Sequence, residues 1–562
     1  METQPTDGRG AGAGYPRWVI LDHEAEYLHV NHPCSAAADA KTEAATLSSG
    51  GHTVRVSLDL RAPPAASRVC YTCSVPVDPA LGPPYMRVAA AHGDSLLVLV
   101  SFSYQEGYEH HTDTIDKYLY NAGAAAAADP PRPPSLVHLP AYYNGEETTL
   151  PSPLPHDLDE KTTGLLRRGE AEADLVVADL IVKDGGEADA PKKEAELLVL
   201  RSGEWSVVRA PIVHDDGKAE ELSFWETDMV VPVGDRRLCW VDLCRGIILC
   251  DMFDDGDETL RPRYFSLPIE PPADDRDRRR CQMSKRRVCV TNGGTVLKRV
   301  DVSPRCCCGR RGATQCDHSS GVFVINTWTL HMDGDDDDMA AYWTMDAMVD
   351  ATELWSLDAY AGVPRINPQF PIVSMDDPDI ICFQVPEEHK IGRKLQSWYI
   401  MLDTSSKTLM SVCRLDESSS LQLSYGYAYF VSTVSHCFNS SDDGGFNNDV
   451  TKPALMIIDD KVATKNNIIA NDSLQSSCES SAKNSKVNSP KEILALLQEI
   501  PELSRDDLLR AYSFLCYDNN GRRLSSLLGL PMSLRKPWLL MEIKASEACS
   551  VCCACRADMQ NV

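Results

Sequence analysis

The chain contains 562 residues, of which 43% are hydrophobic and 24% are charged. This length and apolar content exclude a globally disordered chain and a single small domain. The 82 Asp and Glu residues outnumber the 55 Lys and Arg residues, so the net charge is −27. Because nucleic acids are bound mainly through Lys and Arg, the composition argues against general nucleic-acid binding.

The first stretch, METQPTDGRGAGAG (residues 1–14), predicts a disordered N-terminus and contains no signal peptide. No run approaches the roughly 18 apolar residues of a membrane span, so we expect a cytoplasmic or nuclear protein. Its 21 cysteines are then expected to be thiols. Those at Cys239, Cys250, Cys289 and Cys382 stand in apolar runs, which indicates buried structural thiols.

From Trp18 onward, short β-type runs alternate with Pro, Gly and Asp. Few segments before residue 485 show a sustained helical period, so the pattern predicts an all-β body. The clearest predicted strands, in chain order, are residues 95–102, 175–182, 197–200, 237–251, 321–330, 380–385, 398–402 and 455–458.

Two recurring phrases indicate a repeat. The first runs from Trp, or an apolar equivalent, through β-type residues to Asp: RWVILD (17–22), LCWVDL (238–243), YWTMD (342–346), LWSLD (354–358), SWYIMLD (397–403) and ALMIIDD (454–460). The second closes strands with proline: LVHLP (136–140), VRAPI (208–212) and FSLPI (265–269). Strand, turn, strand and proline exit are typical of a propeller blade. We therefore predict a mainly β fold with an irregular β-propeller-like body, with a pair of β-sandwiches or another sheet-rich fold as the alternative.

Low-complexity stretches mark loops and boundaries, because they cannot bury enough apolar area to order themselves. They are residues 122–134, 183–193, 440–449 and 466–488. The predicted organisation is a disordered N-terminus (1–14), a β body (15–465), a linker (466–488), a helical module (489–545) and a Cys-rich tail (546–562).

The pattern becomes helical after Asn488. The sequence Ser489-Pro490-Lys491-Glu492 has the form of a capping box with proline at the first helical position. It precedes an apolar helical face over residues 493–500, which Pro501 ends. A second helix is predicted over 504–515 and a third short one over 522–528. Because short helices are marginal alone, we expect this small module to pack on the β body.

The sequence Gly93-Asp94-Ser95-Leu96 matches the nucleophile block of an esterase family. Such an enzyme needs a histidine base oriented by a carboxylate, which that family supplies as Asp-x-x-His. None of the 14 histidines has Asp three residues before it. The favoured interpretation is a Gly-Asp turn that leads into the strand at 95–102.

Two cysteine clusters raise the question of a metal site. They are Cys306, Cys307, Cys308, Cys316 and His318, and Cys549, Cys552, Cys553 and Cys555. The second cluster contains one C-x₂-C knuckle, but no matching pair lies nearby. Exposed thiols are the favoured interpretation, and we predict no metal and no cofactor. Cys549, Cys552, Cys553 and Cys555 stay as weak metal candidates.

Two charged runs have alternative interpretations. DGDDDD (333–338) lacks the glycine and glutamate that an EF-hand needs at positions six and twelve, so it predicts a solvated acidic loop. RDRRRCQMSKRR (276–287) is interpreted as the solvated start of a strand, with a nuclear localisation signal or a patch for an acidic partner as the alternatives.

The segment LCWVDLCRGIILCD (238–251) resembles a plant family, expanded in grasses, known as the domain of unknown function DUF 1618. The matching residues are Trp240, Asp242, Arg245, Gly246, Cys250 and Asp251, whereas Cys244 departs from a common aromatic residue. The strongest similarity covers about residues 230–385. The resemblance implies a propeller-like fold related to F-box-associated β domains, with no established activity and no catalytic residues to carry over.

Two functional hypotheses follow. The first is a non-enzymatic protein-interaction scaffold, because rigid loops on one face of a propeller suit partner binding. The second is a hydrolase that uses Ser95 or a metal at a cysteine cluster. The missing Asp-x-x-His and the missing second zinc knuckle favour the scaffold, whose partner proteins the sequence does not identify.

Overall fold

The computed structural model describes the chain in two compact units, one within residues 1–441 and one within residues 442–544. The residues it does not describe are 1–13, 29–38, 76–81, 107–109, 124–131, 144–155, 170, 186–192, 216, 254–259, 270–282, 305–322, 334–339, 388–395, 417–428, 440–489, 502, 517–523, 525–526, 529 and 541–562.

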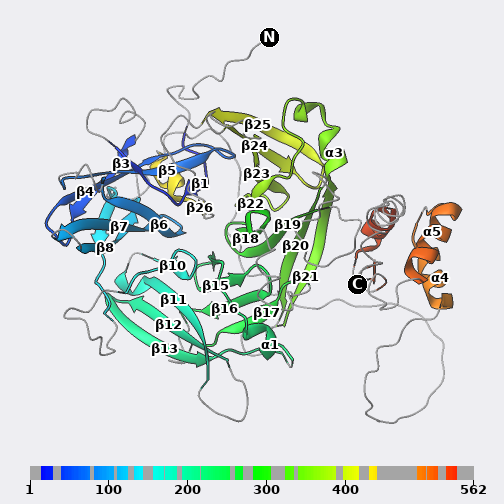
Figure 1. Ribbon diagram of the computed structural model, residues 1–562, viewed down its shortest axis with the longest axis horizontal. Coiled ribbons are helices and arrows are strands. Elements are labelled where there is room, and N and C mark those ends of the chain that lie inside the picture. Colours follow the sequence, from blue (N-terminus) through cyan, green and yellow to red (C-terminus); the bar gives the residue numbers. More distant parts are fainter. Residues whose placement is uncertain are drawn as a thin grey trace, which may run out of the picture. The chain divides into compact units, whose positions relative to one another are not determined.

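The first unit consists of six β-sheets arranged as the blades of a propeller (Figure 1). Blade 2 contains β6 (Tyr85–His92), β7 (Ser95–Glu106), β8 (His110–Asn121) and β9 (Ser135–His138). Blade 3 contains β10 (Thr163–Arg167), β11 (Leu175–Asp184), β12 (Lys193–Arg201) and β13 (Glu204–Pro211). Blade 4 contains β14 (Met229–Val233), β15 (Arg237–Asp242), β16 (Gly246–Asp251) and β17 (Arg263–Ser266).

The next two blades repeat this four-stranded antiparallel order. Blade 5 contains β18 (Arg286–Thr291), β19 (Val296–Pro304), β20 (Phe323–Asp333) and β21 (Ala340–Asp350). Blade 6 contains β22 (Gln369–Val373), β23 (Ile380–Pro386), β24 (Gln396–Asp403) and β25 (Thr408–Asp416). The predicted mainly β, propeller-like body is confirmed, and it has six blades.

Blade 1 joins two distant parts of the chain. Its strands lie in the order β26 (Tyr429–Ser432), β1 (Val19–Asp22), β5 (Ala66–Cys73), β4 (Thr53–Asp59) and β3 (Asp39–Leu47), and β2 (Glu26–Tyr27) pairs with β5. Strand β26 is antiparallel to β1, with Val19 opposite Ser432, whereas β1 and β5 are parallel. The ring is therefore closed by pairing a strand near the end of the body with its first strand.

Hydrophobic clusters fill the interfaces between consecutive blades. Five large clusters join blades 1 and 2, 2 and 3, 3 and 4, 4 and 5, and 5 and 6. A smaller one, with Trp18 and Ile20 against Ile372 and Cys382, joins blades 6 and 1. Because every blade is covered on both faces, its strands need apolar residues on both faces.

This arrangement explains the continuous apolar runs in the sequence. In β7, Leu96 and Val98 enter the cluster shared with blade 1, whereas Leu97 enters the cluster shared with blade 3. In β15, Trp240 packs against blade 3 and Val241 packs against blade 5. Neighbouring residues point to opposite faces of a strand, so each run supplies two interfaces at once.

Of the two predicted repeat phrases, the proline phrase matches the blades and the Trp-to-Asp phrase does not. The proline phrase closes the outermost strand of three successive blades, because Pro140, Pro211 and Pro268 end or follow β9, β13 and β17. The Trp-to-Asp phrase falls on β1, β15, β21 and β24, which occupy different positions in their blades. At 354–358 it falls on the helix α3 (Ala351–Trp355) and the turn after it, so this phrase is wrong as a blade signature.

The second unit is helical in its described part. It contains α4 (Pro490–Gln498) and α5 (Arg505–Cys516), close to the predicted bounds, and residues 532–540 are also helical. Their apolar faces share one cluster that includes Leu497, Leu515 and Leu539. Among the described residues, no helix is long and apolar enough to cross a membrane. The predicted strand at 455–458 and the linker at 466–488 lie outside the described residues.

Candidate functional site

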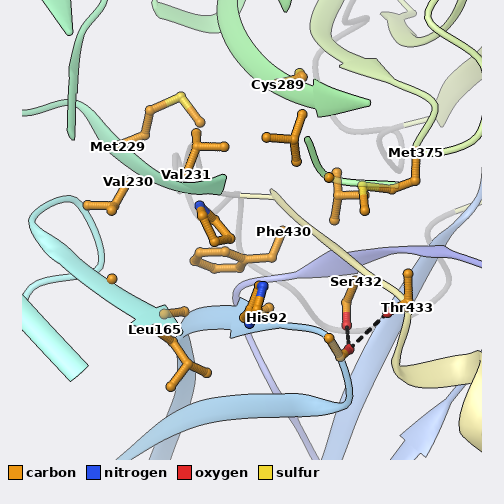
Figure 2. A pocket seen from close by; sticks show the side chains of 18 of the residues that line it. His92, Leu165, Met229, Val230, Val231, Cys289, Met375, Phe430, Ser432 and Thr433 are labelled. Atoms are coloured by element: carbon orange, nitrogen blue, oxygen red, sulfur yellow. Dashed lines mark hydrogen bonds between the residues drawn. The ribbon is translucent and has the colours of Figure 1, made fainter. Parts of the chain in front are cut away.

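A cavity of about 140 Å³ lies where the innermost strands of the blades meet. Figure 2 shows its lining, which is mainly apolar, with the ring of Phe430 from β26 lying next to His92 of β6. The other wall residues include Leu165 of β10, Val231 of β14 and Cys289 of β18. This central cavity is thus built by strands that the sequence separates by more than 300 residues.

Residues of the cavity wall are joined by hydrogen bonds, which link hairpin turns to one another and to the end of β26. Ser432 Oγ and Thr433 Oγ1 each donate to the carbonyl oxygen of Gly93 over 3.2 Å (Figure 2). The backbone N–H of Gly234 donates to the carbonyl of Gly294 over 2.7 Å, and the N–H of Gly293 donates to that of Met375 over 2.9 Å. We call these turns, together with His92, the rim.

The glycines of the rim are required by the shape of its turns. Gly93 and Gly234 have φ angles of 58° and 61°, and Gly294 has a φ of 90°. Side chains with a Cβ atom adopt this left-handed region at a cost, so glycine is the natural residue there. The Gly93-Asp94 pair forms the two-residue turn between β6 and β7, which confirms the predicted Gly-Asp turn.

His92 links three blades through both ring nitrogens. The backbone N–H of Arg167 in blade 3 donates to His92 Nδ1 over 2.9 Å. Since Nδ1 accepts, Nε2 carries the proton, and it donates to the carbonyl of Gly234 in blade 4 over 3.0 Å. Burial lowers the pKa of His92 below its ordinary value of 6.5. The neutral ring therefore acts as a link between blades.

We predict a loss of stability below pH 6.5 that depends on His92. Because the folded pKa is lowered, the unfolded chain binds more protons just below pH 6.5, so the free energy of unfolding falls as the pH falls through this window. Protonation also places a second N–H donor against the N–H of Arg167. The His92→Gln variant keeps one donor and one acceptor but does not titrate.

Urea unfolding between pH 7.5 and 5.5 measures this effect. As the pH is lowered, the urea midpoint of the wild type should fall more steeply than that of His92→Gln, because only the wild type has a titrating side chain at this position. All other titrating groups are the same in both proteins, so their contributions cancel in the comparison. Parallel pH profiles for the two proteins would contradict the assigned role of His92.

Ser95, the candidate nucleophile, is fully buried at the start of β7. Its Oγ lies 2.8 Å from Asp94 Oδ1 and 2.9 Å from Asn121 Oδ1, which are both acceptors. The ring nitrogens of the nearby His92 are occupied by Arg167 and Gly234. In the described part of the chain, the Ser95 hydroxyl therefore holds the β6–β7 turn to β8.

The family-like phrase at 238–251 builds the interior of blade 4. Trp240 is fully buried, and its Nε1 donates to the carbonyl of Thr162 in blade 3 over 2.8 Å. The carboxylate of Asp242 accepts the N–H groups of Cys244 over 2.9 Å and of Glu226 over 3.2 Å. Asp242 therefore holds the turn between β15 and β16 in place.

The remaining residues of the phrase also have structural contacts. Arg245 Nη1 lies 3.3 Å from Asp242 Oδ2, and both side chains are almost completely buried. A Cβ atom at Gly246 would lie 2.3 Å from the ring of Tyr264, so only glycine fits there. Asp251 pairs with Arg236 over 3.0 Å.

The described end of the basic run 276–287 differs from its sequence interpretation. Arg286 is buried in β18, where its Nε lies 3.3 Å from Asp301 Oδ1. Arg287 donates to the backbone carbonyl of Tyr429 in blade 1. The predicted solvated strand start is wrong at these two residues, because β18 is the inner strand of a blade packed on both faces. Residues 276–282 lie outside the described residues.

The buried thiols agree with the sequence prediction. Cys239, Cys250, Cys289 and Cys382 are all buried and free. Burial raises the pKa of Cys382 to about 12 and also raises the pKa of Cys289. Thiols with raised pKa values stay protonated and react poorly.

The two predicted cysteine clusters, including Cys549, Cys552, Cys553 and Cys555, lie outside the described residues, as does most of the acidic run 333–338. Among the residues that are described, no group of three or more His, Cys, Asp and Glu side chains is placed to hold a metal ion.

A second cavity, of about 500 Å³, lies between blades 2 and 3 beside the rim. We call it the arginine cleft, because Arg132, Arg167 and Arg168 line it together with Asp94. Sequence reasoning missed this cleft. Its residues come from four separate parts of the chain, and no motif links them.

The family comparison agrees with the sequence resemblance. Residues 240–382 match the family described as "Protein of unknown function (DUF1618)". The match begins within β15 and ends within β23, so it covers parts of blades 4 and 6 and all of blade 5. No curated protein matches the chain. Residues 240–382 are thus similar to the DUF1618 family, which the phrase at 238–251 also indicates in the sequence.

Proposed function

We propose that this protein is a non-enzymatic scaffold that binds partner proteins at the rim and the arginine cleft. The rim carries the proposal, because its hydrogen bonds join turns from different blades into one fixed surface. Rigid turns on a β framework are well suited to binding, since little conformational freedom is lost when the partner docks.

The reactive side chains near the rim support binding over catalysis. His92 and Ser95 are both engaged in contacts that hold the blades together. General acid–base catalysis needs a group that can exchange protons with a substrate, and these contacts occupy those atoms. The proposal also places the protein in the cytoplasm or nucleus, where the nine free cysteines of the described chain stay reduced.

Hydrogen exchange with a captured partner tests the scaffold proposal. The tagged full-length chain is used to capture partners, and each partner is then purified and bound directly. Exchange should slow in the rim turns at residues 92–95, 234–236, 292–295 and 374–379. Protection confined to the outer strands β3, β13 and β25, or no direct binding by any captured protein, would contradict the proposed function.

The alternative function, a hydrolase, makes a different prediction at Ser95. We expect Ser95→Ala to leave any hydrolysis of a generic ester unchanged, because the Ser95 hydroxyl is buried against Asp94 and Asn121. The assay is p-nitrophenyl acetate hydrolysis by both proteins, with circular dichroism as a folding control. Loss of a saturable activity in a folded Ser95→Ala protein would favour the hydrolase.

The metal-dependent form of the alternative is tested by elemental analysis. A structural zinc site usually has four ligands in tetrahedral geometry, and the tight spacing of Cys549, Cys552, Cys553 and Cys555 disfavours such a site. Protein purified under reducing conditions should therefore contain well below one zinc per chain. One tightly bound zinc that is lost after Cys552→Ser would move the proposed function to this cluster.

A further inference from the structure

The wall of the central cavity leaves large apolar side chains incompletely covered. Met229, Met375 and Phe430 line this cavity, and each remains partly exposed although it packs against a buried cluster. Figure 2 shows Met229 and Met375 on opposite sides of the cavity, with the ring of Phe430 between them in this view. A ligand that removes this apolar surface from water gains free energy in proportion to the area that it covers.

The donors on the polar side chains of the wall are used within the protein. Both ring nitrogens of His92 take part in the hydrogen bonds that link blades 3 and 4. The hydroxyl groups of Ser432 and Thr433 both donate to the carbonyl oxygen of Gly93. An ordered water molecule in a cavity needs two to four polar partners, and these side chains have no donor left to supply them.

The wall is also unsuited to a charged ligand. Arg287 carries the only formal charge among the wall residues that the structure describes. Its guanidinium donates to the backbone carbonyl of Tyr429 and is hydrogen bonded to the thiol of Cys289. Because a charge that enters an apolar site without a partner is strongly destabilised, the chemistry of the wall selects an uncharged molecule.

The size of the cavity narrows the class of ligand further. Its volume is about 140 Å³, and an apolar cavity of about 150 Å³ in another protein binds benzene. Aromatic rings pack favourably against other rings and against thioether sulfurs, which Phe430, Met229 and Met375 provide here. We propose that the central cavity binds a small, uncharged aromatic molecule of about the size of benzene. This inference does not depend on the binding of a partner protein.

Nuclear magnetic resonance of the full-length protein, labelled at its methionine methyl groups, tests the inference with benzene as the probe. Nuclear Overhauser effects should connect benzene to the methyl groups of Met229 and Met375, and both signals should shift saturably as benzene is added. The variants Met229→Leu and Met375→Leu assign these signals with little change in volume. No saturable binding, or saturable effects at other methionines only, would overturn the inference.

Filling the cavity provides a second test. Met229→Trp and Met375→Trp each enlarge a partly exposed side chain of the wall. Either change should weaken benzene binding by about tenfold or more, because the larger ring occupies the ligand volume. The titration is followed at the methyl signal of the methionine that remains.

A matched control, Met410→Trp, makes the same change on strand β25, where Met410 is 57% exposed. This variant should bind benzene like the wild type. Wild-type affinity in both filled variants would contradict the assigned site, as would equal weakening in the control. Circular dichroism checks that each variant is folded, and if neither filled variant folds, the Overhauser effects in the wild type decide.

Phenol and benzoate test the chemistry of the wall, because they are close to benzene in shape. Phenol adds a hydroxyl that needs a partner, and benzoate adds a charge that is costly to bury, so both should bind about tenfold more weakly than benzene or worse. Equal or tighter binding of phenol would show a polar site. Tighter binding of benzoate would show that Arg287 is available to an anion, and either result would overturn the inference.

Discussion

Replacing Trp240 by alanine is expected to lower the free energy of unfolding by about 3–5 kcal/mol. The indole is fully buried in the interface between blades 3 and 4. Its removal leaves a cavity in a close-packed core and takes away the shorter of two hydrogen bonds to the Thr162 carbonyl, which keeps only the 3.4 Å bond from the N–H of Leu180. Denaturant unfolding, followed by circular dichroism of the β body, measures the change.

Trp240→Phe separates the two contributions. Phenylalanine retains most of the apolar packing but cannot donate to Thr162, so the cost should fall to about 1–2 kcal/mol. Control substitutions at Tyr342, which is half-exposed on β21, should change stability by less than about 0.5 kcal/mol. Unfolding of Trp240→Ala at the wild-type midpoint would contradict the role of this residue.

Replacing Asp242 by alanine is expected to cost about 3–5 kcal/mol, the usual result when one partner of a buried ion pair is removed. The change leaves the charge of Arg245 buried without its partner, and it also removes the acceptor of two backbone N–H groups. The carboxylate therefore has three partners, two in the β15–β16 turn and one before β14, and no apolar side chain can replace it.

Arg245→Met should cost less than Asp242→Ala, because Asp242 keeps its bonds to Cys244 and Glu226 in that variant. A double-mutant cycle with both changes isolates the energy of the ion pair from that of the turn. Denaturant midpoints of the four proteins give this comparison. The opposite order of the two single variants would show that the turn contacts contribute little.

Much of the β architecture can be predicted from the sequence by local rules. The apolar runs predict strands that are buried on both faces, because period-2 geometry sends neighbouring residues to opposite sides. The proline phrase marks the outermost strand at Pro140, Pro211 and Pro268, where a missing N–H costs no ladder hydrogen bond. The phrase at 238–251 indicates the same family as the model that matches residues 240–382.

The wrong assignment of residues 354–358 to a strand can be recognised from the sequence, because a helix start precedes this segment. The segment 354–358 resembles a strand phrase, but Asp350 and Glu353 form a capping box that begins α3. Asp350 Oδ1 accepts the N–H of Thr352 over 2.8 Å, and Glu353 Oε2 accepts the N–H of Asp350 over 3.1 Å. An Asp-x-x-Glu pattern marks a helix start more reliably than one tryptophan marks a strand.

The sequence by itself thus determined the fold class, the ends of three blades and the burial of four thiols, since these depend on the pattern of neighbouring residues. Only the tertiary structure decided the number of blades, the closure of the ring by β26 and the position of His92 between Arg167 and Gly234. It also decided that Arg132 and Arg168 share a cleft with Asp94. The reason is physical: these contacts join residues that are distant along the chain, and packing of the blades, not local propensity, brings them together.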